Sequence, residues 1–181
     1  NNKDVWFNSI RLDSQNSLLF HQLGELYSVS LDADMPKQLL SIPAYEAKNN
    51  SKGIMLFEEI KGYEDQWRKH HKSSVTRDIW MKTTDNIFTR LSAHEGEDRN
   101  PVFGSGDAIY YLSEKFGTFN VVKSSLSNPN QVEQISNFKM HPVRHLSISD
   151  TQVLCYSFNG DVYTQTANGK AKKVTIQIHD I

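Results

Sequence analysis

Two arginines occupy equivalent positions in the sequence. Arg99 precedes Tyr111 by the same spacing that separates Arg144 from Tyr156. Guanidinium groups form paired, charge-assisted hydrogen bonds with carboxylates, so two of them near one opening could hold peptide C-termini or acidic side chains. The alternative is structural, because acidic side chains at positions 97 and 98 stand beside Arg99 and could simply pair with it. The candidates for contact with a passing peptide are Asp98, Arg99, Arg144 and His145.

A second cluster of polar groups is the run Trp67-Arg68-Lys69-His70-His71-Lys72. Basic and titratable side chains beside a tryptophan could bind an anion, an acidic peptide or another domain. In the alternative interpretation, the run is a long hairpin whose tryptophan packs on a neighbouring unit while the charges stay in water. We favour packing between domains, with ligand capture as the second possibility. The candidate residues are Trp67, Arg68, His70 and His71.

Neither a catalytic nor a metal-binding pattern is found. Seven histidines and 19 serines are present, but no Gly-x-Ser-x-Gly elbow accompanies them. Adjacent histidines on a strand point to opposite faces, so His70 and His71 are poor partners for one metal ion. We therefore predict no catalytic residue, no metal site and no cofactor in this chain.

Charge and hydropathy exclude two classes of partner. The 181 residues carry 20 Lys and Arg against 21 Asp and Glu, for a net charge of −1. A nucleic-acid binder that neutralises phosphates is normally basic, so nucleic acid is not an expected partner. No apolar run approaches the ~20 residues that a membrane helix requires, and the chain begins without a signal-peptide pattern. The lone Cys155 cannot form an internal disulfide and fits a buried structural thiol.

The local patterns predict an all-β protein. The chain holds 19 Ser and 14 Asn, residues that favour turns and compete with helices. Short runs rich in β-branched and aromatic residues recur between these turns, and apolar periodicity of helical type is absent beyond about two turns. Many short strands are therefore expected.

These strands repeat. Segments resembling Gly24-Glu25-Leu26-Tyr27 recur at 77–80, 117–120 and 160–163, each preceded by a strand ending in an aromatic at 20, 57, 111 or 156. Four short strands in a unit of roughly 40 to 45 residues are typical of a β-propeller blade. We expect four blades, at 4–43, 44–96, 97–140 and 141–178, with a short or irregular strand at 47–50. The recurring aromatics are expected to form the core between blades.

Longer motifs carry a family resemblance. The runs 61–80 (KGYEDQWRKHHKSSVTRDIW), 96–103 (GEDRNPVF), 142–148 (PVRHLSI) and 159–164 (NGDVYT) are similar, in the same order, to segments of tricorn-protease homologues. The resemblance covers about two thirds of the chain, from Lys61 to Ile178. It implies part of the N-terminal six-bladed propeller of a tricorn-like serine peptidase, whose PDZ and catalytic segments are absent from these 181 residues. Four blades in place of six imply either an incomplete propeller or a smaller closed one.

The resemblance also implies a role. The chain would not be an enzyme by itself; it would scaffold the peptidase and screen peptides on their way to the catalytic region. Its partners would be the remaining domains and peptides in transit, and exposed blade edges would favour oligomers. Bacterial homologues suggest a periplasmic location and archaeal ones a cytoplasmic location. The alternatives are a freestanding, TolB-like module that binds a protein partner and, third, a propeller with its own glycosidase site, for which acid pairs are scarce.

Overall fold

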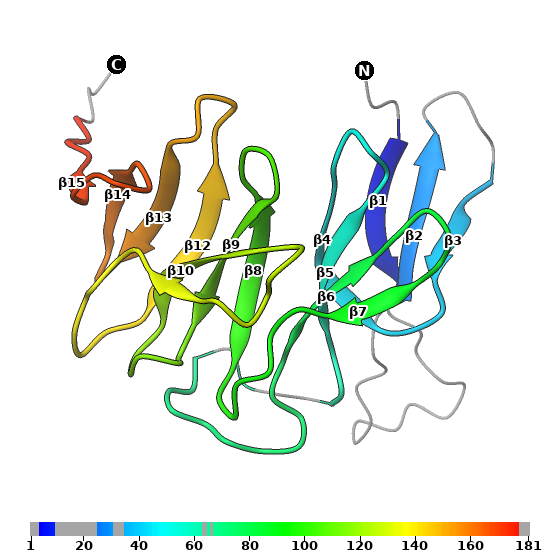
Figure 1. Ribbon diagram of the computed structural model, residues 1–181, viewed down its shortest axis with the longest axis horizontal. Coiled ribbons are helices and arrows are strands. Elements are labelled where there is room, and N and C mark those ends of the chain that lie inside the picture. Colours follow the sequence, from blue (N-terminus) through cyan, green and yellow to red (C-terminus); the bar gives the residue numbers. More distant parts are fainter. Residues whose placement is uncertain (1–3, 10–24, 31–34, 63–64, 66, 178–181) are drawn as a thin grey trace.

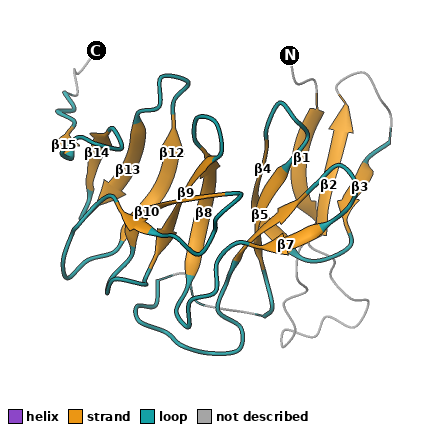
Figure 2. Ribbon diagram, in the orientation of Figure 1, coloured by secondary structure: helices purple, strands orange, loops and turns teal. Residues whose placement is uncertain are grey.

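The structure is a computed structural model that describes residues 4–9, 25–30, 35–62, 65 and 67–177. Every regular element in these ranges is a β-strand, and the strands form four antiparallel sheets (Figures 1 and 2). None of the described segments is a helix long and apolar enough to cross a membrane. The expected all-β, blade-like fold is confirmed.

The sheets follow one another along the chain and are named A to D here. Sheet A contains β1 (Asp4–Ser9), β2 (Glu25–Ser30) and β3 (Lys37–Leu40). Sheet B contains β4 (Ala44–Asn49), β5 (Met55–Glu59), β6 (Ile79–Lys82) and β7 (Phe88–Arg90). Sheet C contains β8 (Asp98–Phe103), β9 (Ala108–Ser113), β10 (Asn120–Ser125) and β11 (Glu133–Gln134). Sheet D contains β12 (Val143–Ile148), β13 (Leu154–Phe158), β14 (Asp161–Gln165) and β15 (Lys172–Lys173).

In the first unit, the strand expected to end at Phe20 lies outside the described residues. Among the described residues β2 pairs with β1, and Phe7 lies opposite Tyr27. Phe57 stands in the same way opposite Trp80 in sheet B. Phe7 therefore holds the register position in sheet A that Phe57 holds in sheet B.

The first strands of sheets B, C and D carry the same irregularity. Each contains a β-bulge, in which two residues face one residue of the next strand. The single residues opposite the bulges are the recurring aromatics Phe57, Tyr111 and Tyr156. In β4 the bulge is at residues 46–47, at the start of the segment 47–50 that was expected to be short or irregular, and the strand is six residues long.

Neighbouring sheets bury the aromatics between them. Phe57 belongs to a core cluster shared by sheets A and B, and Tyr111 to one shared by B and C. Tyr156 belongs to the largest cluster, between C and D. These three side chains are at most 2% exposed, as expected for an interblade core. This stacking brings β8 against both β4 and β12.

Candidate functional site

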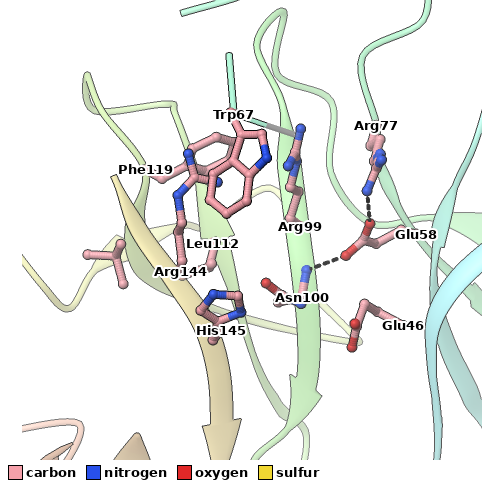
Figure 3. Close-up of a pocket in the computed structure, with 11 residues that line it drawn as sticks. Glu46, Glu58, Trp67, Arg77, Arg99, Asn100, Leu112, Phe119, Arg144 and His145 are labelled. Atoms are coloured by element: carbon pink, nitrogen blue, oxygen red, sulfur yellow. Dashed lines mark hydrogen bonds and ion pairs between the residues drawn. The ribbon is translucent and has the colours of Figure 1, made fainter. Parts of the chain in front are cut away.

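A pocket of about 280 Å³ opens where β4, β8 and β12 lie side by side, and is called the inner-strand pocket here (Figure 3). Its floor and walls combine charged side chains from three sheets with two residues of the 61–77 connection, Trp67 and Arg77. Three of the predicted peptide-path residues, Arg99, Arg144 and His145, line it together. Its other lining residues are Glu46, Glu58, Trp67, Arg77, Asn100, Leu112, Phe119 and Val143.

Arg99 is fixed by a buried ion pair. Its Nη2 lies 2.6 Å from Oε2 of Glu97, and its guanidinium lies 5.5 Å from the ring centroid of Phe119. Glu97 also lies 3.4 Å from Nε of Arg77. The structural alternative, pairing with an adjacent acid, is therefore what the geometry shows for Arg99. Its side chain remains a wall of the pocket, held in one orientation.

Arg144 has a different environment. Its guanidinium lies 4.6 Å from the ring centroid of Trp67, so the connection 61–77 reaches sheet D. Partial burial lowers the pKa of Arg144, and the nearby positive charge of Arg99 adds to this effect. Two guanidinium groups that repel each other at one pocket wall would gain from an anion placed between them.

A buried network that the sequence patterns do not predict lies on the opposite wall. Glu58, 1% exposed, accepts hydrogen bonds from Nη1 of Arg77 at 2.9 Å and from the backbone N–H of Asn100 at 2.6 Å. Desolvation raises the pKa of Glu58, and the charge of Arg77 opposes the rise. The network joins β5 to β8, two strands that are far apart in the sequence and belong to different sheets. Only the three-dimensional pairing of sheets B and C reveals it.

Asp98 does not join the other three candidates. It lines a separate pocket of about 140 Å³ with Ser92, His94, Ser113 and Lys115 among its walls. Asp98 is 1% exposed, and in the described part of the chain neither carboxylate oxygen has a hydrogen-bond partner of good geometry. Burial raises the pKa of Asp98 to about 7, although the neighbouring hydroxyls of Ser113 and Ser92 partly offset the rise. Side chains alternate along β8, so Asp98 and Arg99 face opposite sides.

The connection between β5 and β6 forms no strand in its described part and contacts segments that flank the strands of sheet C. The backbone N–H of His70 donates to Glu114, Lys69 reaches the carbonyl of Met140, and Lys72 pairs with Glu95. Among the four candidates on this connection, only Trp67 lines the inner-strand pocket. Its ring packs on Arg144 while the side chain stays 60% exposed. Arg68, His70 and His71 lie outside the pocket's lining.

No group of three or more His, Cys, Asp or Glu side chains suited to a metal ion occurs in the ranges the structure describes. The pocket instead offers guanidinium, imidazole, amide and carboxylate groups at its surface. Such groups bind polar and charged organic ligands through hydrogen bonds and ion pairs.

No protein-family model matches this sequence, and neither does any curated protein sequence. Solved structures do match. The crystal structure of the tricorn protease superposes with a TM-score of 0.74 at 20% identity, over 90% of this chain and 15% of that one. A putative TolB from Agrobacterium tumefaciens gives 0.66 at 18% identity, over 96% of this chain and 64% of that one. TolB from Acinetobacter baumannii gives 0.69 at 14% identity, over 96% and 41%.

At such low sequence identity, the structural superpositions establish the fold of this chain and nothing finer. The chain spans 15% of the tricorn protease chain and under two thirds of either TolB chain. Its four sheets correspond to blades of the propellers in those proteins. The chain is therefore a β-propeller region of the kind found in tricorn protease and TolB.

Proposed function

We propose that this chain is a non-catalytic propeller region of a tricorn-like serine peptidase. It scaffolds the larger protein and screens extended peptides at the inner-strand pocket, while hydrolysis takes place on other segments. The observation that carries the proposal is the convergence of Arg99, Arg144 and His145 in one pocket of a fold that superposes on tricorn protease with a TM-score of 0.74. Peptide carboxylates are the groups that this wall would hold.

The proposal extends to partners and location. The partners are the remaining domains of the peptidase and peptides in transit. Packing on another domain is supported by two exposed apolar side chains: Trp67 of the connection 61–77, 60% exposed, and Met140, 81% exposed, whose carbonyl accepts a hydrogen bond from Lys69 of the same connection. The resemblance to bacterial homologues supports a periplasmic site of action.

A binding experiment tests the pocket. Fluorescence anisotropy of a labelled extended peptide with a free C-terminal carboxylate is measured against the 181-residue chain. Arg144→Gln should weaken binding by roughly tenfold, since one charge-assisted hydrogen-bonding group is lost. Arg68→Gln removes the same charge outside the pocket and should leave binding unchanged. Equal affinities for Arg144→Gln and the parent would contradict a role for the pocket in peptide screening.

A freestanding TolB-like binding module is the second candidate. It is favoured by the two TolB structures, which each cover 96% of the chain. The coding sequence around these residues separates the two proposals. A PDZ and serine-peptidase region downstream supports the peptidase, whereas a stop codon soon after Ile181 supports the module.

A further inference from the structure

Three side chains of the inner-strand pocket share one unusual backbone conformation. Glu46, Asn100 and His145 have φ angles of 50°, 50° and 57°, in the left-handed region that non-glycine residues seldom adopt. Each belongs to the β-bulge of its strand, in β4, β8 or β12. The spacing from each of them to the aromatic opposite its bulge is identical in the sequence. The same bulge, with a left-handed polar residue, thus occurs on three neighbouring strands.

The bulges aim these side chains into one cavity. All three residues line the inner-strand pocket, and Figure 3 shows Asn100 between Glu46 and His145, in the order of their strands. Bulges reorient side chains beside binding sites, and left-handed non-glycine residues persist only where the surrounding structure enforces them. Three such positions converging on one pocket indicate a site built for a ligand.

The charges of the pocket are separated by side. The central acids are already paired within the chain, Glu58 with Arg77 and Glu97 with Arg99. Glu46 faces the pocket from β4 with a half-exposed carboxylate, whose ion pair with the exposed Lys48 spans 3.3 Å. Arg144 and His145 face it from β12. A ligand in between meets a negative group on one side and cationic or hydrogen-bonding groups on the other.

We propose that the bulge residues Glu46, Asn100 and His145, together with Arg144, bind a short zwitterionic peptide with both termini free. Glu46 receives the ammonium group, Arg144 and His145 receive the carboxylate, and the Asn100 amide hydrogen-bonds to the peptide group between them. A volume of about 280 Å³ suits a ligand the size of a dipeptide, below the usual range for larger ligands of roughly 300–1,000 Å³. This inference rests on the proposed function and narrows its ligand class to small peptides.

The ligand requirement is tested by calorimetric titration of the 181-residue chain with dialanine, N-acetyl-dialanine and dialanine amide. Dialanine should bind, and blocking either terminus should weaken binding at least tenfold, because each cap removes one charge-assisted contact. If the capped dipeptides bind as well as dialanine, the zwitterion proposal is wrong while peptide screening survives. If dialanine does not bind but the labelled extended peptide does, the zwitterion proposal is likewise wrong and peptide screening survives. If neither binds, both proposals fail.

Single substitutions test which side of the pocket binds the ammonium group and which binds the carboxylate. Glu46→Gln should abolish the preference for a free ammonium group while keeping the preference for a free carboxylate. Lys48→Gln is the matched control: it removes the cation that competes for Glu46 and should leave dialanine binding equal or tighter. A loss of affinity in Lys48→Gln equal to that in Glu46→Gln would overturn the assignment.

The bulge itself can be probed without unfolding the chain. Asn100→Gly deletes the amide at a backbone position that glycine adopts freely, so the thermal midpoint should not fall while dialanine affinity drops. Thermal unfolding of the same sample verifies the first expectation. Unchanged affinity in a folded Asn100→Gly variant would show that the Asn100 amide does not contact the ligand.

Discussion

Sheet C is held on its two sides by different chemistry. Toward sheet B, buried ionisable groups cross the junction, including Glu58, Arg77 and Glu97. Toward sheet D, the junction is aromatic: Phe138 stacks on Phe158 at 4.1 Å and meets the edge of Tyr156 at 6.0 Å. One repeating unit therefore supports two kinds of interface. The aromatic side depends on buried area, whereas the charged side, which also buries the apolar cluster around Tyr111, depends in addition on which protons and partners are present.

The largest effect is expected from the aromatic junction. Tyr156→Ala empties a site that is 1% exposed and removes the hydroxyl that bonds Gln165. Loss of a buried large side chain costs about 3–5 kcal/mol. Urea unfolding of the purified chain measures it. Tyr156→Phe, which keeps the ring, should lose only about 1 kcal/mol. Similar losses in both variants would show that the hydroxyl, not the packed ring, dominates this junction.

The charged junction should respond next. Glu97→Gln keeps the shape of the side chain but leaves Arg77 and Arg99 without a shared anion in a buried place. Removing one partner of a buried ion pair costs about 3 kcal/mol. Because the pair is buried, added salt at about 0.5 M should not reproduce the loss in the parent chain. If salt alone destabilised the parent as strongly, the charges would be in contact with solvent.

The third effect depends on pH. Asp98 has a pKa of about 7 in the folded chain and an ordinary value of 3.8, so the folded state keeps a proton that the unfolded state releases. Stability therefore falls as pH rises from about 4 to about 7, and levels off above that. Asp98→Asn should flatten most of this slope and make the variant more stable than the parent at pH 8. Glu58, whose pKa is also raised, accounts for a remaining slope of the same sign.

Chemical denaturation at pH 4, 6 and 8 checks this expectation. The parent and the Asp98→Asn variant should have similar stability at pH 4 and diverge by pH 8. Asp107→Asn is a control at an exposed carboxylate whose pKa is lowered by the hydroxyl and N–H of Ser127. Its stability difference should have the opposite sign. A variant less stable than the parent at pH 8 would show that the Asp98 carboxylate is favourable when charged.

The sequence predicted the repeating features and missed the paired ones. Aromatics such as Tyr111 and Tyr156 recur in register, so the blades and the shared position of Arg99 and Arg144 could be read directly. Pairs such as Glu58 with Arg77 join separate segments of the chain and are not part of the sequence repeat. The bulges are hidden for another reason: a bulge adds one residue without changing the residue types that flank it.

The same limit explains the first unit and Asp98. The position of Phe7 opposite Tyr27 was not predicted, because the two residues are far apart in the sequence. Asp98 was grouped with Arg99 because they are neighbours in sequence. On a strand, neighbours face opposite sides, and the two residues line different pockets. Register along one strand thus predicts more about a site than proximity in the chain does.

The smallest effect on stability is expected at an exposed contact that combines an aromatic ring with a charged group. Trp67 stacks on the cation Arg144 and so combines an aromatic ring with a charge, yet its side chain is 60% exposed. An exposed cation–π contact contributes about 0.5–1 kcal/mol, so Trp67→Ala should shift urea unfolding by no more than this. Peptide affinity should fall further than stability, because the ring forms one wall of the inner-strand pocket. Trp67→Phe should restore most of the affinity. A stability loss as large as that of Tyr156→Ala would mean that contact type, and not burial, sets the strength of both junctions.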